Sequence, residues 1–482
     1  MALSHCWGPP SKRPIITTRE NITNHIERIP FKVLSRTFQD AVDIVRELGQ
    51  SYLWIDSLCI IQDDEEDWAR EAALMADIYR ESFCTISAHS SKDGDGGCRV
   101  NASDEAAEPL RYVDQDVGEY RIRLFETKTN EDKPALQWDV EYGDDLYKFR
   151  PYGSCPLRTR AWTLQERQLS VRSIHFSRST LLWECLEMKG STEVPHDVIR
   201  RYSEPLPLPL PAGELPSDIS AVDQDRWYGM VEDYSSRFLT VESDKLPAMA
   251  GLAKNFQRDA LKNGTYLAGL WKEFFPGALL WRVRRELQLG MPATTSYDIK
   301  APSWSWACLD GEITYASQRV TMTDEEPPKA PLSRITLEGF SLGLTDSYLF
   351  RAPLKASIVV HGQITQATIR YTPSEPSEQD VYKRQLYSKD GDIVGFFYPD
   401  IMFEVQFLRG ITCLGVCDEV YGSTDHPPEV KVTELDEFGD RIMGLALLPD
   451  INSPGTFRRI GLLRWLKNSM FEDAVSLNIK II

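Results

Sequence analysis

The N-terminal part of the chain alternates between apolar segments of strand length and amphipathic helices, and this order constrains the fold more than any other feature. ALSHCWG (2–8), YLWIDSLCII (52–61) and FCTISA (83–88) have the composition of strands, and the second is apolar enough to be covered on both faces. Between them, residues 37–48 and a segment starting at about 64 repeat apolar residues at helical spacing. This alternation predicts a parallel α/β sheet with right-handed crossovers.

The rest of the chain predicts two further regions. We assign residues 1–190 to the α/β domain, with a polar, partly Gly-rich insertion at about 90–158. Residues 191–300 contain a proline tract, EPLPLPLPAGELP (204–216), which favours an extended linker, and then a helical region. Short alternating segments such as RITLEGF and ASIVVHGQI predict a β-rich C-terminal domain over 301–482.

Charge and composition exclude several classes of protein. The 482 residues carry a net charge of −18, so no basic field favours nucleic acid or an anionic membrane. No window approaches the ~18 uninterrupted apolar residues of a membrane span. The N-terminus lacks the basic and apolar parts of a signal peptide. Nine cysteines without paired zinc-ligand spacing predict free thiols in a reducing cytoplasm and no metal site.

Polar residues at the ends of predicted strands are the candidates for a ligand site. No phosphate-loop, hydrolase-elbow or zinc-protease motif occurs in the chain. Open α/β sheets bind ligands where their strands end, and the candidate binding residues there are Ser4, His5, Trp7, Gly8, Asp56 and Gln62. Asp56, inside an apolar segment, must be hydrogen-bonded or functional. We favour a structural bond to a turn or to the Ser4-His5 strand end, with lining of the site as the alternative.

A further candidate lies in RAWTLQER (160–167), where Glu166 follows Trp162 by one helical turn. The structural alternative for Glu166 is a carboxylate that caps its helix or pairs with Arg160 or Arg167. For Trp162, packing in the core is favoured over stacking on a ligand.

Four segments in order resemble the fungal heterokaryon-incompatibility (HET) domain: ALSHCWG (2–8), LWIDSLCIIQDDEEDW (53–68), MADIYRES (75–82) and RAWTLQERQLS (160–170). The family patterns read approximately ALSYxWG, WIDxLCIxQ, MxxIY and RxWTxQExxLS. His5 replaces the more common Tyr, and the family usually has sequence before the first motif, which suggests a shortened gene product. The resemblance spans residues 2–185 and implies non-self recognition and regulated cell death.

The HET domain in turn resembles TIR domains, which implies a TIR-like doubly wound parallel sheet. Some TIR domains cleave NAD at the nicotinamide–ribose bond, using a glutamate on a helix after the third strand and often a Trp four residues before it. Trp162 and Glu166 match this spacing. The resemblance therefore implies that Glu166 is catalytic, that Trp162 binds substrate, and that NAD is a substrate while no cofactor is bound.

The chemistry suits a single carboxylate. Nicotinamide leaves as a neutral group while positive charge develops on the ribose, as in glycoside hydrolysis, and one carboxylate can stabilise that charge. We expect Glu166 to be partly exposed at a helix start and to open onto a cleft at the end of the 2–8 strand, with Trp7 or Trp162 on its wall.

Two functions compete at this point. The first is a TIR-like hydrolase that consumes NAD and so kills or arrests the cell. The second is a non-enzymatic signalling module that acts by self-association and by binding a protein partner. Both readings predict a cytoplasmic protein without a membrane span.

Overall fold

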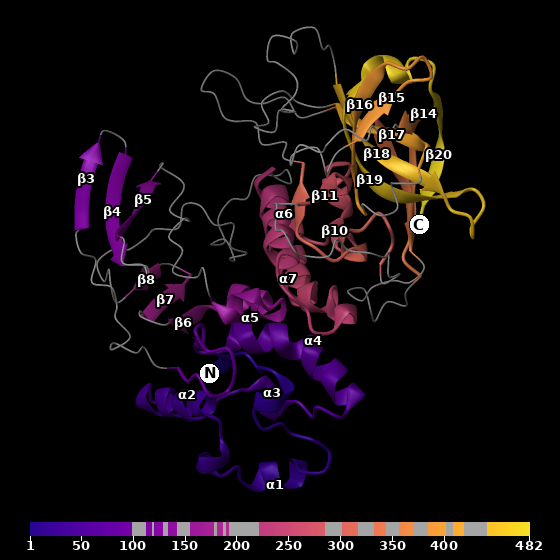
Figure 1. Ribbon diagram of the computed structural model, residues 1–482. Helices are drawn as coiled ribbons and strands as arrows, with labels where there is room; N and C mark the ends of the chain where they lie inside the picture. Colours follow the sequence, from indigo (N-terminus) through magenta and orange to yellow (C-terminus); the bar gives the residue numbers. More distant parts are fainter. Residues whose placement is uncertain are drawn as a thin grey trace. The chain divides into compact units, whose positions relative to one another are not determined.

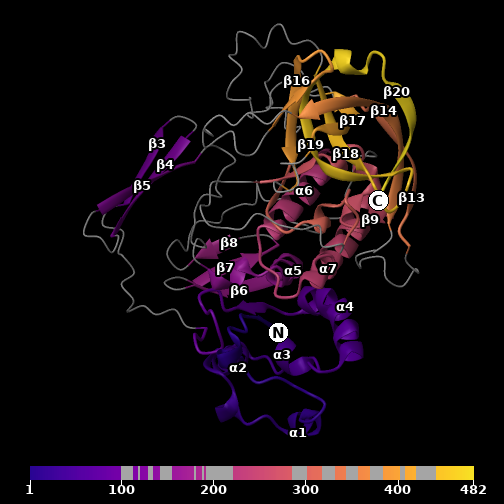
Figure 2. The same ribbon diagram turned by 45° about the vertical axis from the view of Figure 1, so that its right-hand side comes forward.

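Two units make up the computed structural model shown in Figure 1 and Figure 2. The first unit is Met1–Gly213 with Arg237–Leu239, and the second is Glu214–Ser236 with Thr240–Ile482. The structure describes residues 1–98, 112–117, 120–128, 134–141, 155–177, 181–186, 189–191, 221–284, 301–316, 332–343, 356–369, 384–401, 408–418 and 441–482. The predicted proline linker at 204–216 lies outside these residues.

The first unit contains elements that the sequence predicted and others, such as the helix Ile22–Glu27, that it did not. They are β1 (Ala2–Ser4), α1 (Ile22–Glu27), α2 (Arg36–Glu47), α3 (Asp56–Cys59), α4 (Glu65–Glu81), β2 (Thr85–Ser87), β3 (Tyr112–Val117), β4 (Tyr120–Lys128), β5 (Pro134–Glu141), α5 (Trp162–Leu169), β6 (Arg172–Phe176), β7 (Leu181–Cys185) and β8 (Lys189–Ser191). β3, β4 and β5 form a separate antiparallel sheet within the predicted insertion.

The main sheet of this unit has the order β1-β2-β6-β7-β8. β1, β2 and β6 are parallel, whereas β7 and β8 are antiparallel to their neighbours. The register pairs Ser4 with Ser87 and Ser87 with His175, so the carboxyl ends of the three parallel strands lie at one edge. The prediction of a parallel sheet near the N-terminus is confirmed.

One face of this sheet is covered by α2. The helix packs Phe38, Ala41 and Val45 against Leu3 of β1 and Ile86 of β2 in one hydrophobic cluster. This is the apolar stripe expected of an amphipathic helix that lies on a sheet. α2 begins and ends within one residue of the predicted helix at 37–48.

The opposite face is covered by α4 and α5, which lie side by side in both views (Figure 1, Figure 2). Successive side chains of a strand point to opposite faces, so Ser4 and Thr85 point away from α2. The hydroxyl of Thr85 lies 2.6 Å from that of Ser170, the residue that follows α5. Helices therefore cover both faces of the parallel strands.

The predicted strand at 52–61 is wrong. Trp54 forms a single parallel bridge to Ala2 of β1 before Asp56 begins the short helix α3, and Ile61 forms another to Thr17. The Asp56 Oδ1 atom accepts a hydrogen bond of 2.7 Å from the amide of Ser57. An aspartate that is bonded to its neighbouring amide favours a turn or a helix start over a strand. The segment therefore forms a helix at this point despite its apolar composition.

The second unit combines helices with an antiparallel barrel. Its elements are α6 (Ala221–Ser235), α7 (Pro247–Phe256), β9 (Tyr266–Leu267), β10 (Leu270–Trp271), β11 (Trp281–Val283), β12 (Ile313–Tyr315), β13 (Ile335–Ser341), β14 (Ser357–Ile369), β15 (Arg384–Tyr387), β16 (Ile393–Pro399), β17 (Gly410–Asp418), β18 (Arg441–Pro449), β19 (Thr456–Lys467) and β20 (Val475–Ile481). The predicted β-rich C-terminal region is confirmed. No helix among the described residues is long and apolar enough to cross a membrane.

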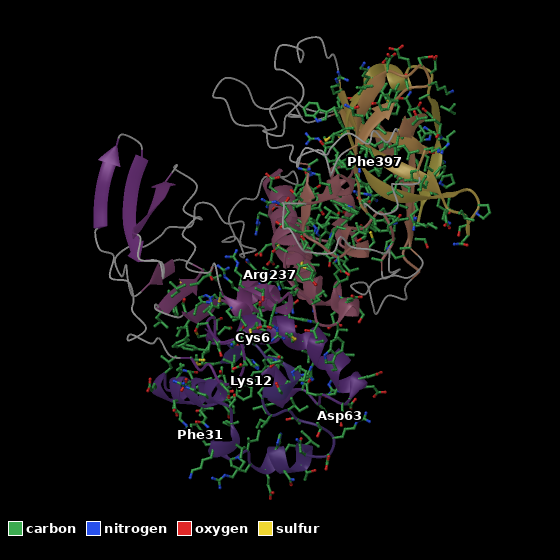
Figure 3. All side chains as sticks on the ribbon, viewed as in Figure 1. Cys6, Lys12, Phe31, Asp63, Arg237 and Phe397 are labelled. Atoms are coloured by element: carbon green, nitrogen blue, oxygen red, sulfur yellow. The ribbon has the colours of Figure 1, made fainter. Side chains whose placement is uncertain are left out.

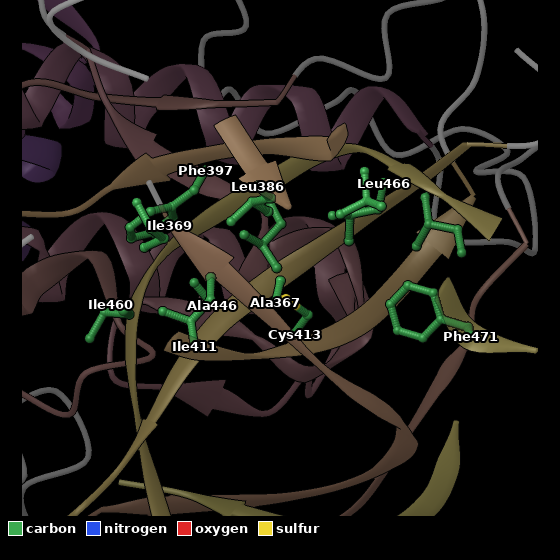
Figure 4. Packing of buried hydrophobic residues seen from close by; sticks show 13 residues of the cluster. Ala367, Ile369, Leu386, Phe397, Ile411, Cys413, Ala446, Ile460, Leu466 and Phe471 are labelled. Carbon is green, nitrogen blue, oxygen red and sulfur yellow. The ribbon is translucent and has the colours of Figure 1, made fainter. Parts of the chain in front are cut away.

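The barrel closes because β14 pairs with both ends of the strand order. The path runs β14-β15-β16-β19-β18-β17, and β17 pairs back onto β14. Its interior is filled by apolar side chains that point inward from all six strands, among them Leu386, Phe397, Cys413 and Leu466 (Figure 4). Closure leaves these strands without a free hydrogen-bonding edge over their paired length.

A buried ion pair joins this barrel to the helical part of the same unit. The side chains of Arg459 and Asp400 are fully buried, with 3.1 Å between Nε and Oδ2. The guanidinium also donates to the carbonyls of Leu279 and Trp281, and it lies 3.3 Å from the ring centroid of Trp281. The charge of Arg459 is thus compensated on every side by acceptors and an aromatic face.

Removing the acid should therefore destabilise the second unit strongly. We expect Asp400→Ala to lower the free energy of unfolding by about 3–5 kcal/mol, because the Arg459 charge stays buried without its counter-charge. Urea unfolding of the full chain, followed by tryptophan fluorescence, measures the change. Glu312→Ala is the control, since its pair with Arg284 is half exposed and should contribute less than about 1 kcal/mol. Equal effects of the two substitutions would contradict the assignment.

Candidate functional site

The candidate site lies in the first unit, where β1 ends against α4 and α5. Ser4 is the last residue of β1, and Glu166 lies in the middle of α5. Both side chains are buried, with 2% of Ser4 and 6% of Glu166 exposed. The carboxyl end of a parallel strand is where open α/β sheets bind ligands, so this position suits a functional group.

Polar groups surround the Glu166 carboxylate without supplying all of the hydrogen bonds that it can accept. Among the described residues, neither its Oε2 atom nor the Ser4 hydroxyl has a hydrogen-bond partner of good geometry. Burial raises the pKa of Glu166 to about 7, and the negative charge of Asp56 adds to this rise. The hydroxyls of Ser4 and Tyr79 and the guanidinium of Arg160 lower the pKa and so oppose the rise. The carboxyl group is therefore about half ionised at neutral pH, as a general acid or base requires.

The expectation of a partly exposed Glu166 is wrong. The sequence pattern around Glu166 is polar. However, α5 lies beside α4 on one face of the sheet, and Glu166 is enclosed there next to Ser4 of β1 and Tyr79 of α4. α5 is held there by the short stretch at residues 237–239, because the amide of Ala161 donates to the carbonyl of Phe238 and the amide of Phe238 to that of Thr159. These two bonds anchor the start of α5 to a stretch that is distant in sequence.

Three of the other predicted residues meet around Asp56. The indole of Trp7 donates to Asp56 Oδ2 at 2.8 Å, and His5 Nδ1 lies 3.7 Å from Oδ1. The amide of the Gln62 side chain donates to the Asp56 carbonyl at 3.0 Å. Burial lowers the pKa of His5, so its imidazole is neutral at pH 7. These contacts fix the end of β1 to α3, in line with the structural role favoured for Asp56.

Gly8 and Trp162 contact protein groups. Gly8 has a φ of +75°, and a Cβ there would lie 2.5 Å from Cβ of Asp93, so only glycine fits this turn. Trp162 packs edge to face on Trp68 of α4, with 6.4 Å between ring centroids. Both observations agree with a packing role, which was the favoured interpretation of Trp162.

A second polar group, which the sequence did not indicate, lies beside this site. Arg167 binds Glu184 through two hydrogen bonds of 2.9 and 3.2 Å, and Glu184 Oε2 lies 3.2 Å from Nε2 of His175. Nδ1 of His175 lies 3.1 Å from Nε2 of His89. His89 and His175 stand 86 residues apart in sequence, and only the pairing of β2 with β6 brings them together. No local pattern could have revealed the contact.

Burial and the ionic partners within the group together determine its charges. Although burial opposes ionisation, Arg167 and His175 hold the pKa of Glu184 well below its usual range. Burial, together with the neighbouring His175 and Arg167, holds the pKa of His89 well below its usual value, so His89 is neutral at pH 7. Among the described residues, no group of three or more His, Cys, Asp or Glu could hold a metal ion.

Both polar groups border one small pocket, which we call the arginine pocket. Its lining residues are Ser4, Ser87, His89, Leu157, Arg158, Thr163, Arg167 and Arg237. The enclosed part measures about 10 Å³, which is room for roughly one water molecule. Arg237, labelled in Figure 3, comes from the stretch between α6 and α7 and donates to the Thr163 hydroxyl at 3.2 Å. Ser4 lies between this pocket and Glu166.

The raised pKa of Glu166 makes stability depend on pH in a defined direction. An exposed glutamate in the unfolded chain titrates near 4.5, whereas Glu166 in the folded chain titrates at about 7. The folded state therefore holds an extra proton in this window, and its stabilising effect is complete below pH 4.5 and is lost as the pH rises through 7.

Glu166→Gln removes this titration. Relative to the wild type, we expect the free energy of unfolding of Glu166→Gln to increase by roughly 3 kcal/mol between pH 4.5 and pH 8. Urea unfolding at several pH values measures the difference. Glu66→Gln, at the exposed start of α4, is the control and should show no such trend. A difference between wild type and Glu166→Gln that does not change with pH would contradict the enclosed carboxylate.

Comparison with known proteins agrees with the four sequence segments. Residues 1–166 match the family model of the heterokaryon incompatibility protein (HET). No curated protein and no solved structure matches the chain. The matched range includes the end of β1 and all of α5 up to Glu166, whereas His175, Glu184 and Arg237 follow it. The chain therefore carries a heterokaryon incompatibility (HET) domain over residues 1–166.

Proposed function

We propose that this protein acts in fungal heterokaryon incompatibility by hydrolysing NAD at the nicotinamide–ribose bond, in the cytoplasm and as part of regulated cell death. The observation that carries the proposal is the enclosed carboxyl group of Glu166, whose pKa is about 7. Groups whose pKa is strongly shifted by burial at the end of a parallel sheet are candidates for catalysis.

The topology supports a TIR-like arrangement. With the Trp54 bridge counted as a rudimentary strand, the parallel strands lie in the chain order 2-1-3-4, since Trp54 neighbours β1, β1 neighbours β2 and β2 neighbours β6. This matches the start of the 2-1-3-4-5 order of flavodoxin-like doubly wound sheets. α5 then follows the third parallel strand, as the catalytic helix does in TIR enzymes.

The proposed reaction needs little more than one carboxylate. The bond between the nicotinamide nitrogen and C1′ of the ribose breaks with its electron pair leaving on nicotinamide, which departs neutral. Water forms the new bond to C1′ and releases one proton. Ionised Glu166 would stabilise the positive charge that develops on the ribose and could accept the proton of the water. The hydroxyl of Ser4, next to the carboxylate, would orient the ribose.

The second candidate is a module that signals by association with like domains and a protein partner, without catalysis. The burial of Glu166 also supports this candidate, because NAD has no access to the carboxylate in this structure. Glu166 is only 6% exposed, and the neighbouring pocket has room for roughly one water. An enzyme with this structure must open before NAD can enter, and self-association is one way to open it. Assays must therefore include concentrated or clustered protein.

The test is release of nicotinamide from NAD by the full chain over a wide range of protein concentration. We expect Glu166→Gln to reduce turnover roughly a hundredfold, because loss of one charge-stabilising group costs ~3 kcal/mol in the transition state. The exposed control Glu66→Gln should keep wild-type turnover.

Two outcomes decide against the enzyme. A Glu166→Gln protein with wild-type turnover would remove Glu166 from the mechanism. A wild type that releases no nicotinamide either as a dilute or as a clustered protein would favour the association module.

A further inference from the structure

We propose that the arginine pocket binds the phosphate groups of a nucleotide. Three of its lining residues are arginines (Arg158, Arg167 and Arg237), and no Asp or Glu is among the residues that line it. These guanidinium groups lie in a chain whose net charge is −18, and one of them, that of Arg167, is paired with Glu184. Guanidinium groups present several donors in a planar fork that matches the oxygens of a phosphate.

Two of the arginines are held in place before any ligand binds. Arg167 is fixed by its two hydrogen bonds to Glu184. Arg237 is 9% exposed and is fixed by donation to the Thr163 hydroxyl at 3.2 Å and to the Arg160 carbonyl at 3.4 Å. Side chains already ordered in the free protein lose less conformational entropy on binding. The structure therefore holds two of the cations in position for an anion.

A buried hydroxyl also points to a ligand. The Ser4 side chain lines the pocket and is 2% exposed; its Oγ atom lies near the Glu166 carboxyl group but makes no hydrogen bond of good geometry among the described residues. Buried polar groups are usually satisfied, so an exception calls for an explanation such as an absent ligand or water. A phosphate oxygen in the pocket would accept this hydrogen bond.

The position of the pocket fits a nucleotide. Ser4 and Ser87 end adjacent parallel strands, and phosphates commonly bind at this edge of open α/β sheets. Arg158 is exposed. Because a phosphate is larger than the one water that the enclosed part can hold, its binding requires this side chain to move. Because Ser4 separates the pocket from Glu166, a phosphate bound here would leave the attached ribose next to that carboxylate. This last step rests on the proposed function, whereas phosphate binding does not.

The experiment is calorimetric titration of the full chain with ADP, adenosine and pyrophosphate. We expect ADP to bind at least tenfold more tightly than adenosine, and its affinity to fall as salt is raised. Arg158→Gln and Arg237→Gln should each weaken ADP about tenfold or more, the usual effect of losing one charge-assisted hydrogen bond. Arg46→Gln, on the exposed surface of α2, should bind ADP like the wild type.

Thermal unfolding of each variant separates folding from binding. If Arg237→Gln does not fold, Arg158→Gln still tests the proposal, because a substitution at this exposed position should leave folding intact. ADP that binds no better than adenosine, or binds equally to wild type and Arg158→Gln, would overturn the proposal. Pyrophosphate that binds as tightly as ADP would overturn the nucleotide assignment. ADP binding is measured without turnover, so a wild type that binds ADP but releases no nicotinamide from NAD loses the proposed function and keeps this site.

Discussion

The alignment of three parallel strand ends determines where the candidate groups of the first unit lie. Ser4, Ser87 and His175 occupy neighbouring positions at one edge because β1, β2 and β6 pair in that register. The Glu166 carboxylate lies against the first of these residues, and the His89–His175 contact depends on the other strands. A shift of one residue in either pairing would turn these side chains to the opposite face, where α2 lies, and would separate both polar groups.

Burial in this arrangement affects the ionisation of two glutamates in different ways. Glu166 is buried next to Ser4 and Tyr79 without full hydrogen-bond satisfaction, so its charged form is disfavoured and its pKa is about 7. Glu184 is equally buried, but a bidentate arginine and a histidine keep it ionised. The pKa values of two buried glutamates in one unit are thus shifted in opposite directions by their different neighbours. The paired one organises Arg167, and the unsatisfied one is available for chemistry.

The sequence predicted the local elements well where a single pattern governed them. The apolar stripe of α2 and the run that forms β2 needed no long-range information. The segment at 52–61 was misassigned because Asp56 bonds its neighbouring amide and begins a helix, which an apolar count cannot register. Glu166 stands out in the sequence by its spacing from Trp162, but its burial depends on neighbours distant in sequence, among them Ser4 of β1 and Tyr79 of α4. Arg237 and the His89–His175 contact were missed because only tertiary pairing brings these residues to the site.

The proposed chemistry depends on Glu166 being an enclosed carboxyl group that exchanges its proton near neutral pH. The most direct test is ¹³C NMR of the full chain labelled at the glutamate carboxyl carbon, with the Glu166→Gln spectrum used to assign the signal. The account predicts a titration midpoint close to 7 for this carbon, well above that of the surface glutamates. A midpoint near 4.5 would show that Glu166 is solvated like any surface carboxylate, and would contradict the account.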